Sequence, residues 1–281
     1  MSRRALSFVF FGSLAGAALL SLARALWPFA ENSAADLTTE ALTTLLCAAA
    51  ALSLCLRSDQ RLWPPKGSRF AFPAPCPTIF AVCTVLCFLV ALNNLPLLSL
   101  LSGRAQVTAG GGRILLFACV CLSTACFEEL FFRAFLFPLL LQRARGARGI
   151  LLAVLLSAAI FGAAHFFNLA AGASLPATLL QVGYSFLVGC AAALLFLFSR
   201  SILLPILFHA VYNFGGLLVE RLGEGQIFDT PTVIFTAVLA VVCAVFLVFA
   251  LFSPALVAAK DQILEKKTKK TPQNADFFEK I

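Results

Sequence analysis

A pair of acidic residues interrupts one of the most apolar stretches of this sequence. Glu128 and Glu129 stand next to each other there, and Arg133 follows four residues after Glu129. Ionisable side chains are costly to bury in an apolar segment, so each of them needs a reason. An acid and a base at positions i and i+4 of a helix lie on one face, which predicts an ion pair between Glu129 and Arg133. Glu128 points about 100° away from its neighbour and is left free to exchange protons.

The two histidines of the chain both stand in apolar stretches as well. Phe161 and His165 share one helix face, and the small residues 162–164 between them let another helix come close. His209 and Asn213 are also spaced at i and i+4. Three apolar segments therefore each present polar groups on a defined face.

Packing is the first alternative for these polar groups. A lone histidine or asparagine in a membrane segment more often forms an interhelical hydrogen bond than a catalytic site. Two acids, an arginine, both histidines and an asparagine together are harder to attribute to packing, because a site is recognised by groups with converging roles. We therefore favour a functional site over structural hydrogen bonding.

The same groups suit hydrolysis of a peptide bond by water. A glutamate shielded from bulk solvent can take a proton from water. An imidazole N–H and a carboxamide can donate hydrogen bonds to the oxyanion that forms. This chemistry needs no serine or cysteine as nucleophile.

A catalytic zinc ion is the alternative mechanism. Glu128, His165 and His209 could supply the two-histidine, one-carboxylate ligand set of some zinc enzymes. The sequence lacks the H-E-x-x-H helix that makes such an assignment strong. We therefore expect no metal and no other cofactor, with Zn²⁺ as the alternative.

The elements that carry these groups are predicted to be transmembrane helices. The 281-residue chain is 61% hydrophobic and 12% charged, with a mean hydropathy of +0.96, whereas soluble domains carry about 25% charged residues. Lipid must therefore be the main solvent. A helix needs about 20 apolar residues to cross the hydrocarbon core, which predicts an all-α polytopic membrane protein with about eight spans. They lie near 5–27, 37–56, 77–101, 114–141, 149–170, 176–198, 201–219 and 232–258, and Pro138 is expected to break the fourth near its end.

The distribution of positive charge predicts the orientation of these spans. Most of the 21 basic residues fall in alternate loops and in the C-terminal tail, while Arg104, Arg113 and Arg221 fall in the loops between. Basic loops face the cytoplasm, so we expect both termini on that side of an integral protein of the cell's inner membrane. The net charge of +8 is scattered over many short loops, which argues against a nucleic-acid partner.

Three motifs in this order resemble those of a known family of membrane proteins. Glu-Glu-x-x-x-Arg at 128–133, Phe-x-x-x-His at 161–165 and His-x-x-x-Asn at 209–213 resemble the CPBP family. This is the CAAX-protease and bacteriocin-processing group, also called Abi, and it includes the type II CAAX prenyl endopeptidases. The resemblance implies an eight-helix intramembrane endopeptidase.

The resemblance also implies a role for each residue of the motifs. Glu128 and His165 would activate a water molecule. His209 and Asn213 would stabilise the oxyanion. The remaining two motif residues, Glu129 and Arg133, would support the site.

These expectations define a domain organisation and a set of partners. We predict a single transmembrane domain over 1–258, with a peptidase core at about 114–219, and a basic cytoplasmic tail over 259–281. The predicted partners are membrane lipid and a protein or peptide substrate, prenylated or processed at its C-terminus. Whether CAAX motifs are cleaved stays open, because fold-level analogy does not determine a substrate.

Two rival functions belong to other classes. Buried glutamate and histidine also form the proton relays of membrane transporters, but transporters usually carry paired repeats, and here every candidate residue lies after residue 127. A catalytically inactive scaffold or immunity-type protein of the same family is the second rival. Such a protein would tolerate loss of the acids.

Overall fold

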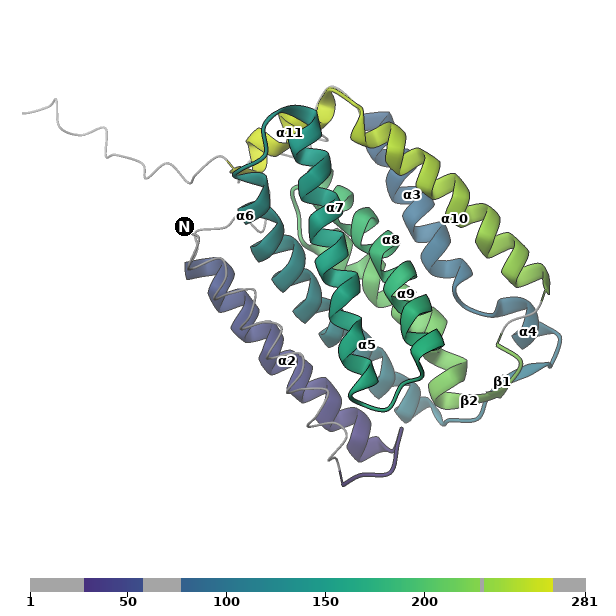
Figure 1. Ribbon diagram of the computed structural model, residues 1–281. Helices are drawn as coiled ribbons and strands as arrows, with labels where there is room; N and C mark the ends of the chain where they lie inside the picture. The colour runs from purple at the N-terminus through teal and green to yellow at the C-terminus, as the bar shows by residue number, and fades with distance from the viewer. Residues whose placement is uncertain (1–27, 58–76, 228–229, 265–281) are drawn as a thin grey trace, which may run out of the picture.

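The computed structural model describes residues 28–57, 77–227 and 230–264, and they are almost entirely helical (Figure 1). The helices are α2 (Ala34–Arg57), α3 (Pro77–Asn93), α4 (Leu97–Leu101), α5 (Gly111–Glu129), α6 (Phe137–Leu141), α7 (Gly146–Ala164), α8 (Leu175–Ser199), α9 (Leu203–Leu222), α10 (Thr230–Leu251) and α11 (Ala255–Leu264). Two segments of different helical type continue α5 and α7: a π-helix, η1 (Leu130–Leu136), and a 3₁₀ helix, η2 (His165–Leu169).

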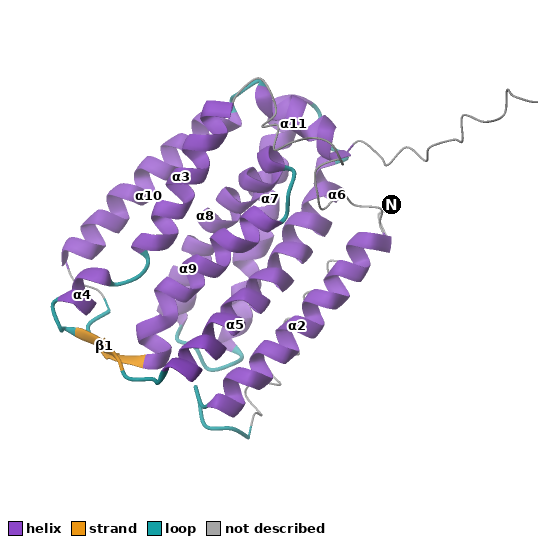
Figure 2. Ribbon diagram, turned by 180° about the vertical axis from the view of Figure 1, so that it is seen from behind, coloured by secondary structure: helices purple, strands orange, loops and turns teal. Residues whose placement is uncertain are grey.

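The helices form one bundle with α5, α7, α8 and α9 in the middle (Figure 1). On one side α2 packs along α5 and η1. On the other side α3 packs on α9 and α8, and α10 packs on α3. Helix α11 lies across one end of the bundle against α6, α7 and α8, while Figure 2 shows the two short strands at the opposite end.

Five helical segments are long and apolar enough to cross a membrane. They are α2, the continuous helix from α5 to α6, α7 with η2, α8 and α9; two shorter apolar helices, Phe80–Asn93 and Val233–Phe249, accompany them. The predicted all-α membrane architecture is confirmed, but the count of eight spans is not. The predicted span 5–27 lies outside the described residues, so the orientation of the termini stays a prediction.

Two predicted spans are divided by short turns. Instead of one helix over 77–101, α3 ends at Asn93 and α4 begins after Pro96. Instead of one helix over 232–258, α10 ends at Leu251 and α11 follows Pro254. Proline lacks the N–H that would continue the helix and disfavours helical geometry in the preceding residue, which explains both interruptions.

Helix α11 crosses the predicted boundary at 258/259 between membrane domain and tail. Lys260 within it donates a hydrogen bond of 2.6 Å to the carbonyl oxygen of Ala144, in the turn before α7. The basic segment 265–281 lies outside the described residues.

The longest helix contains an irregularity that the sequence did not reveal. It runs from Gly111 to Leu141 and continues through Pro138, which lies at the start of α6. The predicted break at that proline is therefore wrong. The departure from α-helical hydrogen bonding lies earlier, in η1, which begins directly after Glu129 and includes Arg133. π-helical turns inside α-helices are rare and occur frequently at functional sites.

A two-stranded antiparallel sheet joins the start of α5 to the end of α9. Strand β1 (Ala105–Val107) pairs with β2 (Gly223–Gly225). Gly225 has a φ of +106°, and a Cβ at Gly223 would collide with the carbonyl oxygen of Gln106. Glycine at both positions therefore permits this close pairing.

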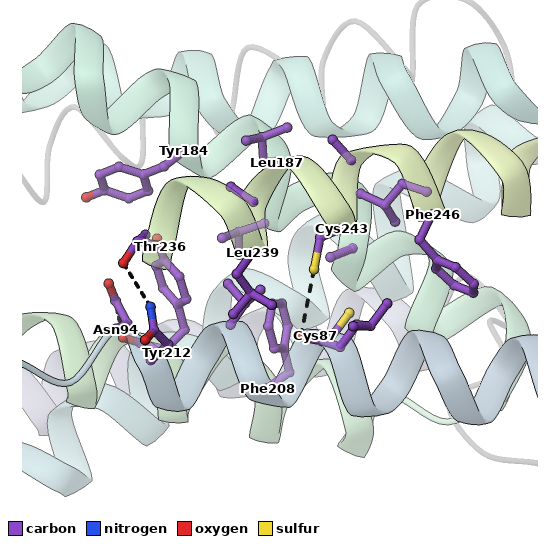
Figure 3. A pocket seen from close by; sticks show the side chains of 18 of the residues that line it. Cys87, Asn94, Tyr184, Leu187, Phe208, Tyr212, Thr236, Leu239, Cys243 and Phe246 are labelled. Carbon is purple, nitrogen blue, oxygen red and sulfur yellow. Dashed lines mark hydrogen bonds between the residues drawn. The ribbon is translucent and has the colours of Figure 1, made fainter. Parts of the chain in front are cut away.

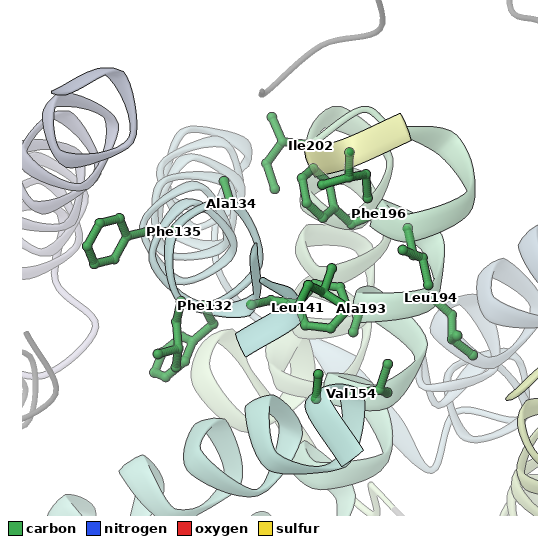
Figure 4. Packing of buried hydrophobic residues seen from close by; sticks show 14 of the residues in the cluster. Phe132, Ala134, Phe135, Leu141, Val154, Ala193, Leu194, Phe196 and Ile202 are labelled. Atoms are coloured by element: carbon green, nitrogen blue, oxygen red, sulfur yellow. The ribbon is translucent and has the colours of Figure 1, made fainter. Parts of the chain in front are cut away.

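All seven residues of η1 are buried, and aromatic side chains pack together there. Phe131, Phe132 and Phe135 are all buried. Figure 4 shows side chains of this segment beside those of α7 and α8, including Val154 and Phe196. This packing holds the π-helical segment, and the charged residues on it, in the centre of the bundle.

Candidate active site

Four of the six predicted site residues form one connected cluster. The Nδ1 atom of His209 lies 2.8 Å from Oε1 of Glu129, and its Nε2 lies 3.5 Å from Oε2 of Glu128. The guanidinium of Arg133 lies 3.1 Å from the same Glu129 oxygen. The ion pair predicted from the i, i+4 spacing is thereby confirmed. Helix α9 places one imidazole against two adjacent carboxylates of α5.

The two carboxylates differ in exposure and in partners. The side chain of Glu129 is 0% exposed, and both Arg133 and His209 contact it closely. The side chain of Glu128 is 21% exposed, and its contact with His209 is longer. Glu128 is therefore the acid that water or a substrate can reach.

Arg133 is fully buried, which is unusual for an arginine. Its guanidinium carbon lies 4.1 Å from the centre of the Phe161 ring, a cation–π contact. Its three nitrogens, Nε, Nη1 and Nη2, have no partner in hydrogen-bond geometry among the described residues, so its contact with Glu129 is an ion pair. Gly189 of α8 leaves room for this side chain, because a Cβ there would lie 3.1 Å from Nη2. The charge is balanced by Glu129 and by aromatic rings rather than by a full set of hydrogen bonds.

His165 occupies the first position of η2, directly after α7, and is half-buried. Its Nδ1 lies 3.1 Å from the carbonyl oxygen of Phe161, and its Nε2 lies 3.5 Å from Oγ of Ser185 on α8. A carbonyl oxygen only accepts hydrogen bonds, so Nδ1 carries the proton of the neutral ring. The unprotonated nitrogen that could act as a base is Nε2.

The ring of Phe161 joins His165 to the rest of the cluster. Its centroid lies 5.2 Å from that of His165 and 5.8 Å from that of His209, both in edge-on geometry. The opposing helix also comes close here, as the small residues predicted: a Cβ at Gly162 would lie 2.9 Å from the carbonyl oxygen of Val182 on α8.

Asn213 lies one turn beyond His209 on α9 and is half-buried. The turn after α3 contacts the neighbouring backbone, because Asn94 Nδ2 donates a hydrogen bond of 2.8 Å to the carbonyl oxygen of Tyr212. A Cβ at Gly216 would collide with the Asn94 side chain. The sequence did not predict this contact beside Asn213.

The donor atoms fit a metal ion poorly. Both ring nitrogens of His209 face carboxylate oxygens, and the Nδ1 of His165 faces a carbonyl oxygen. Within residues 28–57, 77–227 and 230–264, no group of three or more His, Cys, Asp or Glu side chains is placed to hold a metal ion. The imidazole nitrogens are thus engaged by oxygen atoms of the protein, with only Nε2 of His165 facing a hydroxyl group.

A cavity of about 130 Å³ lies between α3, α8, α9 and α10 (Figure 3), and none of the six predicted site residues lines it. Most of its lining is apolar, and Asn94, Tyr184 and Tyr212 stand toward one end. Two of its lining residues are sequence neighbours of site residues: Phe208 precedes His209, and Tyr212 precedes Asn213. Helix α9 thus lines the cavity and carries part of the site.

Acidic and imidazole side chains that meet inside a helical membrane bundle suit an intramembrane hydrolase. Residues 110–215 match the family model described as type II CAAX prenyl endopeptidase Rce1-like. This match confirms the resemblance to the CAAX-protease family that the three motifs indicate. The matched segment contains all six predicted site residues. Searches of curated proteins and of solved structures find no match.

The family match supports a class of activity at a coarse level. Proteins of the matched family are peptidases, which supports a CAAX-type membrane hydrolase with a lipid environment and a peptide substrate. An integral membrane protein is in keeping with its apolar helices.

Proposed function

We propose that this chain is an endopeptidase that hydrolyses a peptide bond with a water molecule activated by Glu128 and His165. The asymmetry between the two adjacent carboxylates carries the proposal. Arg133 and His209 engage Glu129, whereas Glu128 is partly open. A base must reach both the water and the leaving group, and of the two acids the more exposed one meets that requirement.

Glu128 takes a proton from the attacking water and later delivers it to the leaving amine. His165 assists through Nε2, the nitrogen left unprotonated when Nδ1 donates to the Phe161 carbonyl. Peptide-bond cleavage is completed without a covalent intermediate, because water is the nucleophile. Glu128 thus acts first as a base and then as an acid: the C–N bond breaks as the proton taken from water passes to the departing nitrogen, and Glu128 is left as a carboxylate again.

His209 and Asn213 stabilise the oxyanion of the tetrahedral intermediate. Glu129 accepts a hydrogen bond from Nδ1 of His209, which fixes the ring and leaves Nε2 facing the open side of the site. To donate to the oxyanion, the ring must also carry a proton on Nε2, the nitrogen that faces Glu128. Donors aimed at developing negative charge in a water-poor site contribute strongly to such reactions.

Substitution of Glu128 and His165 tests this mechanism. In membranes where the substrate is processed, we expect Glu128→Ala and His165→Ala each to lower the rate of cleavage about 100- to 10,000-fold, the usual contribution of general acid–base catalysis. Glu224→Gln is a matched control, because this acid is exposed on β2, away from the site. Cleavage at the normal rate by either alanine variant would refute the peptidase mechanism and favour the transporter or scaffold alternatives.

A chelator separates this mechanism from a zinc-dependent one. We expect purified wild-type protein to keep its activity after incubation with 1,10-phenanthroline and removal of free metal. Loss of activity that added Zn²⁺ restores would show that Glu128, His165 and His209 bind a metal instead.

A further inference from the structure

A buried hydroxyl group faces the basic nitrogen of His165. Ser185 is 3% exposed in the middle of α8, and its Oγ lies 3.5 Å from Nε2. A hydroxyl inside a helix often bonds to the carbonyl one turn back, as Thr178 does with Ser174 in the same helix. The hydroxyl of Ser185 instead has the imidazole as its partner.

The helices around Ser185 hold it at this place. Gln181, one turn earlier on α8, accepts a hydrogen bond of 2.8 Å from Asn168 of η2. Gly189, one turn later, packs so closely on α7 that a Cβ would lie 3.1 Å from Ala158. Residues four apart share a helix face. Gln181, Ser185 and Gly189 therefore lie on one face of α8, and this face contacts the helical segment of α7 and η2 that carries His165.

The imidazole of His165 is therefore held at both nitrogens. The Phe161 carbonyl accepts from Nδ1, and the hydroxyl of Ser185 donates to Nε2. Two contacts at opposite sides of the ring restrict its rotation, which a single contact would allow. The contact at Nε2 is long for a hydrogen bond, so an incoming water can replace it without a large loss.

We propose that Ser185 is a positioning residue: its hydroxyl holds the imidazole of His165 in place, with Nε2 directed at the position that the attacking water takes when it displaces that hydroxyl. The proposal rests on the proposed function, because it assigns to Ser185 a role in that reaction. Ser185 acts through the imidazole and forms no bond to the substrate.

Spectroscopy of the two histidines tests the contact without any cleavage assay. The chain holds only two histidines, so ¹⁵N-histidine labelling of the full chain in lipid gives two ring systems, and His165→Gln identifies which signals belong to His165. We expect His165 to be protonated at Nδ1 and its Nε2 signal to move in Ser185→Ala. An Nε2 signal that stays in place would overturn the proposal.

Kinetics of a matched pair of variants tests the role. Thr and Val have the same shape, and Thr alone keeps the hydroxyl. We expect Ser185→Val to lower kcat about 3- to 10-fold relative to Ser185→Thr, with KM unchanged. This is the usual energetic contribution of one neutral hydrogen bond. Ser157→Ala is the control, since it removes another buried hydroxyl, one that donates to the Phe132 carbonyl. Equal kcat for the Thr and Val variants would contradict the positioning role.

Two further outcomes separate this inference from the proposed function. In the first, Glu128→Ala cleaves normally while the His165 signal still moves in Ser185→Ala. The contact between Ser185 and His165 is then real, but the proposed function is wrong. The positioning role is wrong as well, because it is a role in that reaction. If a fluorophosphonate labels Ser185 covalently, the serine is a nucleophile and the positioning role is wrong. We expect no label.

Discussion

The bundle contains two clusters of charged residues around an arginine, one near its end and one at its centre. They differ in how completely their polar atoms are hydrogen-bonded. Near the end that carries the strands, Arg221 of α9 pairs with Glu40 of α2 at 2.8 Å and also contacts Asp36. Its Nε donates a hydrogen bond to Asn32. In the centre, Arg133 has one close carboxylate oxygen, on Glu129, and aromatic rings for its other neighbours.

The charged groups of the cluster at the end are hydrogen-bonded to one another, whereas the central cluster has polar atoms without partners and a carboxylate that solvent can reach. The guanidinium of Arg221 meets both oxygens of Glu40 in a two-pronged contact, a geometry that fixes two helices. In the central cluster Oε2 of Glu129 has no hydrogen-bond partner among the described residues, and Glu128 is partly exposed. Unsatisfied polar groups in a buried site are costly and call for an explanation, of which catalysis is one.

The largest difference between the clusters is expected when each arginine is removed. Arg133→Met leaves Glu129 buried with His209 as its one remaining partner, so we expect a loss of about 3–5 kcal/mol in unfolding free energy. Unfolding in detergent, followed by circular dichroism against denaturant, measures it. A loss below 1 kcal/mol would mean that the central pair contributes little to the fold.

A smaller loss is expected at the other cluster. Arg221→Met removes hydrogen bonds to Glu40 in a setting that is 13% exposed, and we expect about 2 kcal/mol of lost stability. Catalysis by the residual folded protein should be unchanged, because no site residue contacts Arg221. A fall in kcat without a fall in stability would make this cluster part of the site.

The smallest effect concerns the space beside Arg133. Gly189→Ala places a methyl group 3.1 Å from the guanidinium and from Ala158, and we expect a loss of about 1–2 kcal/mol from overpacking. Gly183→Ala is the control, since nothing lies within 4 Å of a Cβ there on the same helix. Equal stability of the two variants would show that the close approach does not matter.

Local spacing explains what the sequence predicted well. The Glu129–Arg133 pair and the shared face of His209 and Asn213 follow from helix geometry alone, and the apolar lengths of the central spans follow from the thickness of a bilayer. The small residues after Phe161 also predicted a close helix contact, which α8 supplies.

Contacts between distant segments could not be predicted in the same way. The partners of Ser185 and Asn94 lie on other helices, and no spacing within α8 or α3 reveals them. The pairing of β1 with β2 joins residues more than a hundred positions apart. The π-helical hydrogen bonding of η1 could not be predicted either, because its residues are as apolar as those of an ordinary α-helix.

The division of labour between Glu128 and Glu129 is tested most directly by one pair of isosteric variants. We predict that Glu128→Gln lowers kcat about 100- to 10,000-fold while the midpoint of unfolding stays at the wild-type value. Glu129→Gln should instead lower stability by about 3–5 kcal/mol, because it leaves Arg133 uncompensated. Normal cleavage by Glu128→Gln would contradict the account, and so would a Glu129→Gln variant as stable as the wild type.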